Sequence, residues 1–206
     1  MLTIVKLIIN LLLKESKMTA QRSDKLIYKG NEYELASEPL NSYLKGTGIR
    51  LAQISTACHR GYVAEWLVED DKLFLTDFNA FIPNKDTDKN WVNKDEIEEV
   101  GLEYLFPNQD KVFAEWFSGV LRVPHGEMIR YVHQGYASIY EKELYLRFVN
   151  GKYVSYREID QAHLRGNEMA LKEKAMDGIW EAIFGVKRSK IEPKKNWFNK
   201  FLDNFR

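Results

Sequence analysis

Residues 59–78 read HRGYVAEWLVEDDKLFLTDF, and this stretch decides the fold that we expect for the chain. Apolar side chains alternate with other residues from Tyr62 to Val68, as in a strand with one face against a core. The acidic segment 69–71 has the composition of a turn, and residues 73–75 (LFL) begin a second apolar run. The stretch therefore predicts a β-hairpin.

The first motif of this hairpin occurs again in HQGYASIYEKELYL, residues 133–146. Histidine, glycine and tyrosine keep their spacing, Tyr140 takes the place of Trp66, and LYL answers LFL. With a turn at 141–143, we expect a second hairpin that is pseudo-equivalent to the first. Glycine ahead of the tyrosine is typical of a bulge or a close approach of two backbones.

Turn sequences divide much of the remaining chain into short strands. Residues 29–31 and 150–151 are hairpin signals, and the proline and glycine within 124–126 predict a turn between two strands. We also expect a short helix over 93–101, because it opens with a capping pattern and ends at glycine. Residues 107–117 fit either a helix or a strand, and this choice stays open.

From about residue 161 the sequence is rich in helix formers. Apolar residues from Met169 to Ile183 share one helical face, and a second apolar stripe begins at Trp197. The order of elements predicts the α+β class, with a β-rich, mostly antiparallel meander that forms an open sheet or partial barrel. We expect a β-rich domain over 18–160, a short middle helix, and C-terminal helices over 161–206 that pack on the domain.

The composition excludes several classes of protein. The chain has 206 residues, 45% hydrophobic and 29% charged, which indicates a globular rather than a disordered protein. Its 30 Lys and Arg balance its 30 Asp and Glu, which argues against a dedicated nucleic-acid binder. The single cysteine, Cys58, excludes a disulfide-built secreted fold and favours the cytoplasm. The four histidines lack the spacing of a metal site, so we expect no metal and no cofactor.

Residues 1–17 are the most apolar part of the chain. They are too short for a membrane-spanning helix, which needs roughly 20 apolar residues. Lys14 and Glu15 can be encoded by a bacterial ribosome-binding sequence placed just ahead of Met18, so we interpret residues 1–17 as a translated leader. A short membrane anchor is the alternative, and it is the interpretation under which a membrane would be a partner.

The two repeated motifs also contain the candidate site. A pocket between them would have histidines at its rim and aromatic walls, with Arg60 as a fixed positive charge for a carboxylate or phosphate. The sequence does not indicate catalytic residues. The residues expected to bind a ligand or partner are His59, Arg60, Tyr62, Trp66, His133, Tyr136 and Tyr140.

Our leading hypothesis is a non-enzymatic binding protein whose partner is another protein, as for an inhibitor, an immunity protein or an accessory factor. It would act through an aromatic surface on the repeated hairpins. The alternative is a small-ligand-binding protein or enzyme with a pocket between the two motifs. The first hypothesis predicts a flat surface with exposed aromatic residues, and the second predicts a concave site. Basic and aromatic residues over 187–198 leave weak nucleic-acid binding as a third hypothesis.

Overall fold

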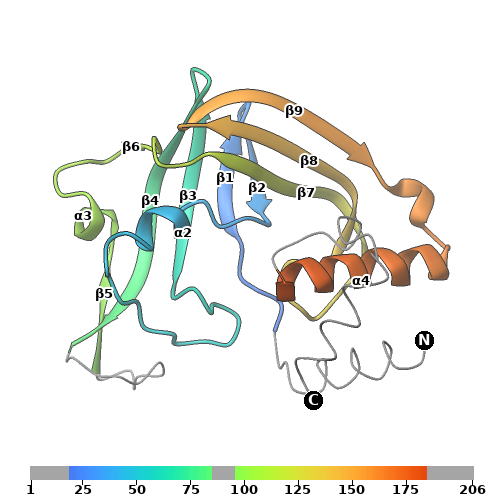
Figure 1. Cartoon of the computed structure of the whole chain (residues 1–206), viewed down its shortest axis with the longest axis horizontal. Coiled ribbons are helices and arrows are strands. Elements are labelled where there is room, and N and C mark those ends of the chain that lie inside the picture. Colours follow the sequence, from blue (N-terminus) through green and yellow to red (C-terminus); the bar gives the residue numbers. More distant parts are fainter. Residues whose placement is uncertain (1–18, 85–95, 185–206) are drawn as a thin grey trace, which may run out of the picture.

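The computed structural model describes residues 19–84 and 96–184, and within them nine strands form one sheet (Figure 1). Its main path runs β2-β1-β3-β4-β9-β8-β7, while β5 and β6 pair with β4. The strands are β1 (Asp24–Tyr28), β2 (Asn31–Leu35), β3 (Tyr62–Glu69), β4 (Lys72–Pro83), β5 (Ile97–Val100), β6 (Val112–Phe113), β7 (Gly119–Arg130), β8 (Ile139–Val149) and β9 (Lys152–Asp160). The helices are α2 (Asn41–Leu44), α3 (Leu102–Leu105), the 3₁₀ turn η2 (Ala162–Leu164) and α4 (Glu168–Phe184).

The sheet curls until its outer strands β2 and β7 approach each other. The amide of Ala36, just after β2, donates to the carbonyl of Arg122 in β7 at 2.9 Å. The Arg122 amide donates in turn to the Ser37 hydroxyl at 2.8 Å. The pairing of β4 with β9, by contrast, consists of Lys72 opposite Lys152, so the sheet is open on that side. The expected α+β fold, a mostly antiparallel open sheet with a few helices, is confirmed; the parallel pairing of β1 with β3 interrupts the expected meander.

The hydrophobic core lies inside this curl. Its largest fully buried side chain is Trp66, on the face of β3 that also carries Tyr62 and Ala64, as the alternation predicts. Burial of a large apolar side chain contributes about 1.5–3 kcal/mol to folding. Strands β4, β7 and β8 supply the other walls through Leu73, Leu75, Leu121, Val123, Leu146 and Phe148, all at most 1% exposed.

Three tight turns fall where the sequence predicts them, and each uses two residues with positive φ. The values are 51° and 74° at residues 29–30, 48° and 57° at residues 70–71, and 49° and 71° at residues 150–151. Two successive positive φ angles give a turn whose twist matches that of the flanking strands. The hairpin expected over 59–78 is therefore confirmed as β3 and β4.

The prediction of a second, pseudo-equivalent hairpin was wrong. Strand β8 runs from Ile139 to Val149 without a break, straight through the turn expected at 141–143. The turn expected at 124–126 is also replaced, because β7 continues across a bulge in which Gly126 has a φ of 79°. A bulge and a turn both use glycine at positive φ, so the local sequence does not distinguish them. The motif at 133–136 consequently lies in the loop that joins β7 to β8.

The middle helix is displaced from its expected place. Residues 97–100 form β5, which pairs with β4, and α3 begins after Gly101, where the expected helix was to end. The open choice over 107–117 resolves into the two-residue strand β6 followed by a turn. Pairing with a neighbouring strand thus overrides the helical pattern at 97–100.

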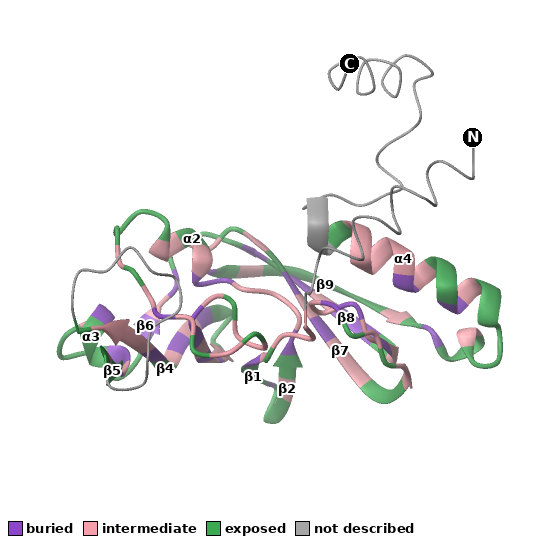
Figure 2. Cartoon of the chain, turned by 90° about the horizontal axis from the view of Figure 1, so that it is seen from below, coloured by how far each residue is buried: buried purple, intermediate pink, exposed green. Residues whose placement is uncertain are grey.

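Helix α4 lies against β8 (Figures 1 and 2). Leu171 and Ala175 pack on Ile139 in a small second core. Met169, which we expected on the buried face, is instead 81% exposed. The expected leader, the N-terminus of the middle helix and the stripe from Trp197 lie outside the described residues. In the described part of the chain, no helix has both the length and the apolar character needed to cross a membrane.

Candidate functional site

Residues 19–22 bring the two His-x-Gly-Tyr motifs together. On one side, the amide of Gln21 donates to the carbonyl of Gly135 at 3.0 Å, and the amide of Gly135 donates to the carbonyl of Thr19 at 3.2 Å. On the other side, the amide of His59 donates to the side-chain oxygen of Gln21 at 2.9 Å. Two loops that are distant in sequence therefore share one backbone segment as their common edge.

Both motifs need a glycine for the same conformational reason. Gly61 has a φ of 78° and Gly135 has a φ of 52°, in the left-handed region that favours glycine. A Cβ atom on Gly61 would also lie 2.9 Å from the Cβ atom of Leu51. The repetition thus reflects two tight turns ahead of a tyrosine, and the turns sit in different structural settings.

A buried ion pair forms the floor of the site. Arg60 Nη2 donates to Asp24 Oδ1 at 2.5 Å, and these side chains are 4% and 0% exposed. Asp24 also accepts hydrogen bonds from the Ala64 amide and the Trp66 indole, each at 3.0 Å. Burial raises the pKa of Asp24, and the charge of Arg60 and the hydrogen bonds of Trp66 and Ala64 oppose that rise. Three N–H donors therefore support a carboxylate that burial alone would disfavour.

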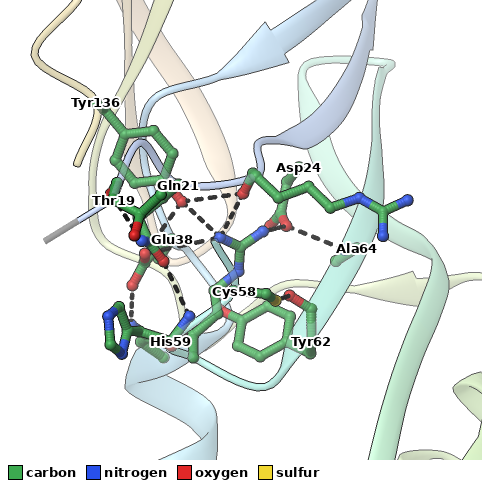
Figure 3. A network of polar contacts seen from close by, with 12 residues as sticks. Thr19, Gln21, Asp24, Glu38, Cys58, His59, Tyr62, Ala64 and Tyr136 are labelled. Carbon is green, nitrogen blue, oxygen red and sulfur yellow. Dashed lines mark hydrogen bonds and ion pairs between the residues drawn. The ribbon is translucent and has the colours of Figure 1, made fainter. Parts of the chain in front are cut away.

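Tyr136 closes this network from the second loop (Figure 3). Arg60 Nη1 donates to the Tyr136 hydroxyl at 2.5 Å, and that hydroxyl donates to Glu38 Oε1 at 3.1 Å. Asn41 donates through Nδ2 to Glu38 Oε2 at 2.5 Å and accepts from the Tyr62 hydroxyl at 2.9 Å. Tyrosine phenols are neutral hydrogen-bond donors at physiological pH, and burial raises the pKa values of Tyr62 and Tyr136 further.

A pocket of about 1000 Å³ opens beside this network. Small-molecule sites usually span about 300–1,000 Å³, so this pocket is large for a single compact ligand. Its walls come from the segments 19–21, 36–53, 59–60 and 135–136. The lining residues are Thr19, Gln21, Ala36, Ser37, Glu38, Asn41, Leu44, Lys45, Ile49, Leu51, Gln53, His59, Arg60, Gly135 and Tyr136.

The structure brings three of the predicted site residues to this pocket: His59, Arg60 and Tyr136. Tyr62 and Trp66 are 1% and 0% exposed and form part of the core beneath it. An exposed aromatic surface on the first hairpin, as expected for a protein partner, would need these two side chains at the surface. That part of the expectation was wrong.

The other two predicted residues do not line the pocket. His133 is exposed, and its Nδ1 lies 2.8 Å from the hydroxyl of Tyr131. Tyr140 lies near the start of β8, where its carbonyl accepts a hydrogen bond from Gln161 at 3.2 Å. The loop at 133–136 therefore contributes its glycine and tyrosine to the site, and its histidine points elsewhere.

Sequence reasoning missed both acidic residues of the network. Asp24 shares the inward face of β1 with Leu26 and Tyr28, so the strand's alternation was a usable signal for a buried carboxylate. Glu38 precedes the four-residue helix α2 in an irregular connection. No periodicity in that connection indicates which way its side chain points.

A second, partly buried ion pair supports the backbone of Tyr136. Arg122 Nη1 donates to the Tyr136 carbonyl at 3.0 Å, and Nη2 donates to Glu143 Oε1 at 2.7 Å. Glu143 also accepts from the Tyr145 hydroxyl, and Lys174 of α4 lies 3.6 Å away. Burial by itself would raise the pKa of Glu143, but Arg122 and these partners outweigh it and lower the pKa to about 2. The position of Tyr136 is thus fixed through both its backbone and its side chain.

No protein-family model, curated protein or solved structure matches this chain. Among the described residues, no three His, Cys, Asp or Glu side chains are grouped to hold a metal ion. The function is therefore inferred from the geometry of the pocket and its polar network.

Proposed function

We propose that the chain binds a small molecule in the pocket between His59 and Tyr136. The observation that carries this proposal is that a pocket of about 1000 Å³ and a buried polar network occupy the same place. Concave sites with a few convergent polar groups and shifted pKa values are the usual location of ligand binding in proteins.

The polar groups of the network are held before any ligand arrives. Arg60, Glu38 and Tyr136 each contact two or more partners, so their side chains are already ordered. A site whose groups are already ordered loses less conformational entropy when it binds. The engaged, neutral phenol of Tyr136 supports binding through hydrogen bonds rather than proton abstraction.

The small-molecule hypothesis is better supported than the protein-partner hypothesis. The latter depended on aromatic residues of the first hairpin, and burial removes Tyr62 and Trp66 from any partner's reach. A protein partner on another surface stays a prediction.

A thermal-shift screen of a metabolite library against the full chain tests the proposal. A ligand at 100 times its Kd stabilises the folded state by about 2.7 kcal/mol, which is a readily measured rise in Tm. Ala36→Phe places a large side chain on the pocket wall and should abolish the rise. Val154→Phe, at a half-exposed position of β9 outside the pocket, should preserve it.

The proposal is wrong if no compound raises the Tm. It is also wrong if the rise survives Ala36→Phe unchanged, because the ligand would then bind elsewhere.

A further inference from the structure

We propose that the ligand is a primary amine on an apolar body and that Glu38 receives its ammonium group. This inference rests on the proposed function, because it names the class of molecule that the same pocket would take. It also replaces the expectation that Arg60 would bind a carboxylate or phosphate.

Arg60 is not available to an anion. Its Nη1 donates to the Arg22 carbonyl at 2.7 Å and to the Tyr136 hydroxyl at 2.5 Å, while Nη2 donates to Asp24 at 2.5 Å. The side chain is 4% exposed, and its Nε is buried without a hydrogen-bond partner among the described residues, so the guanidinium offers an anion almost no accessible surface. An incoming anion would have to displace these contacts and leave Asp24 buried without its partner.

The three charged side chains at the floor of the pocket do not cancel. Two carboxylates, Asp24 and Glu38, face one guanidinium, Arg60, so these three ionised side chains sum to −1, and the exposed Lys45 on the pocket lining brings the total to zero. Asp24 has the close contact with Arg60 at 2.5 Å, whereas Glu38 lies 3.8 Å from Arg60 Nη1. Glu38 is therefore the less compensated of the two carboxylates, and its side chain is 29% exposed on the pocket wall.

The two side chains that hydrogen-bond to the Glu38 carboxylate are neutral, so neither one cancels its charge. Within residues 19–84 and 96–184, each of its oxygens accepts one hydrogen bond, from the neutral Tyr136 hydroxyl and from the neutral Asn41 amide. Figure 3 shows Tyr136 and Glu38 side by side in this network. A carboxylate oxygen has two lone pairs, so both oxygens retain acceptor capacity for an ammonium donor.

The rest of the lining defines the remainder of the ligand. Leu44, Ile49 and Leu51 give the pocket an aliphatic wall, which favours an apolar body on the amine. Lys45 is exposed and also lines the pocket, so it repels a second ammonium group. This combination favours a monoamine over a polyamine.

Three probes of equal length test the assignment on the ¹⁵N-labelled full chain: n-hexylamine, hexan-1-ol and hexanoate. Each is titrated while the amide resonances of Gln21, Gly135 and Tyr136 are followed by NMR. We expect hexylamine to shift these resonances with a Kd at least about tenfold lower than that of hexanoate, a difference of about 1.4 kcal/mol.

Glu38→Gln removes the charge and keeps the shape, so it should weaken hexylamine binding about tenfold and leave hexan-1-ol unchanged. Glu32→Gln is the matched control, because Glu32 is an exposed carboxylate of β2 that does not line the pocket. It should have no effect on any probe.

If hexanoate or hexan-1-ol shifts the pocket resonances at least as strongly as hexylamine, the amine assignment is wrong and ligand binding in the pocket stands. If no probe shifts them, the amine assignment is wrong, and the thermal-shift screen decides separately whether the pocket binds a small molecule. Equal loss of hexylamine binding in Glu38→Gln and Glu32→Gln would show a nonspecific charge effect and also overturn the assignment.

Discussion

Asp24→Asn should be among the most destabilising single substitutions in the sheet. Asparagine has nearly the volume of aspartate, but it cannot neutralise Arg60, whose side chain is 4% exposed. Removal of one partner from a buried ion pair costs about 3–5 kcal/mol when the remaining charge is uncompensated, and Glu38, 3.8 Å from Arg60 Nη1, offsets part of that cost here. Solvent does not reduce this figure, since Asp24 itself is 0% exposed.

Urea unfolding followed by tryptophan fluorescence measures the effect. Lys25→Gln is the matched control, because Lys25 is 50% exposed and lies 3.3 Å from Glu65 and 3.7 Å from Glu32, which are 38% and 65% exposed. Solvent screens such pairs, so the control should leave the free energy of unfolding unchanged within error. A loss of less than about 1 kcal/mol in Asp24→Asn would refute the reasoning, because such a value is typical of ordinary substitutions.

The double variant Asp24→Leu/Arg60→Met separates the charge from the packing. Apolar residues that replace both members of a buried ion pair often restore or increase stability. We therefore expect the double variant to be more stable than Asp24→Asn. A double variant as unstable as the single one would mean that the hydrogen bonds of Asp24 to Ala64 and Trp66 dominate instead.

Two further predictions concern the supporting structure. The pKa of Glu143 is about 2, against its ordinary 4.5. Its charged form therefore stabilises the fold by about 3 kcal/mol above about pH 4.5. This contribution is lost as the pH falls towards 2. Unfolding at several pH values should show a shallower acid dependence in Glu143→Gln, and an unchanged slope would contradict the assignment. Gly151→Ala puts a Cβ 2.6 Å from the Ala114 carbonyl oxygen at a φ of 71°, whereas Gly166→Ala has open space at 74°. Gly166→Ala should therefore lower the free energy of unfolding by about 1 kcal/mol through backbone strain, and Gly151→Ala should lower it clearly more. Equal losses in the same unfolding assay would contradict the predicted clash at Gly151.

The sequence predicts those parts of the fold that depend on local conformation. The turns at 29–30, 70–71 and 150–151 each need two residues with positive φ. The pairs present there are Lys29–Gly30, Asp70–Asp71 and Asn150–Gly151. The course of β7 and β8 is different, since Gly126 serves a bulge and the charged segment 141–143 continues a strand. Only pairing between the two strands decides those cases, and pairing is not a local property.

The candidate site, like the fold, was predictable from the sequence only where it depends on local motifs. The two His-x-Gly-Tyr motifs predict a pocket between two hairpins; the structure places them in two loops, where Arg60 and Tyr136 are 2.5 Å apart at their polar atoms. The partner of Arg60 could not be identified in this way, because Asp24 lies in a strand that pairs in parallel with β3. Without that carboxylate, Arg60 has the appearance of a free anion site. Asp24 is therefore the reason that we propose a cationic ligand instead of the anion expected from Arg60 alone.

A buried ion pair at the floor of a pocket needs a reason other than stability, because apolar residues in the same place often serve the fold equally well. The Asp24–Arg60 pair joins β1 to the first loop and, through Tyr136, to the second. It thereby fixes the phenol that orients Glu38. The double variant should consequently retain stability, and because it keeps the charge of Glu38 it should still prefer hexylamine over hexanoate. It should bind hexylamine less tightly, however, because Glu38 is no longer held in place. If hexylamine bound as tightly as to the unaltered chain, Glu38 would be oriented without the ion pair, and the pair would have no part in binding.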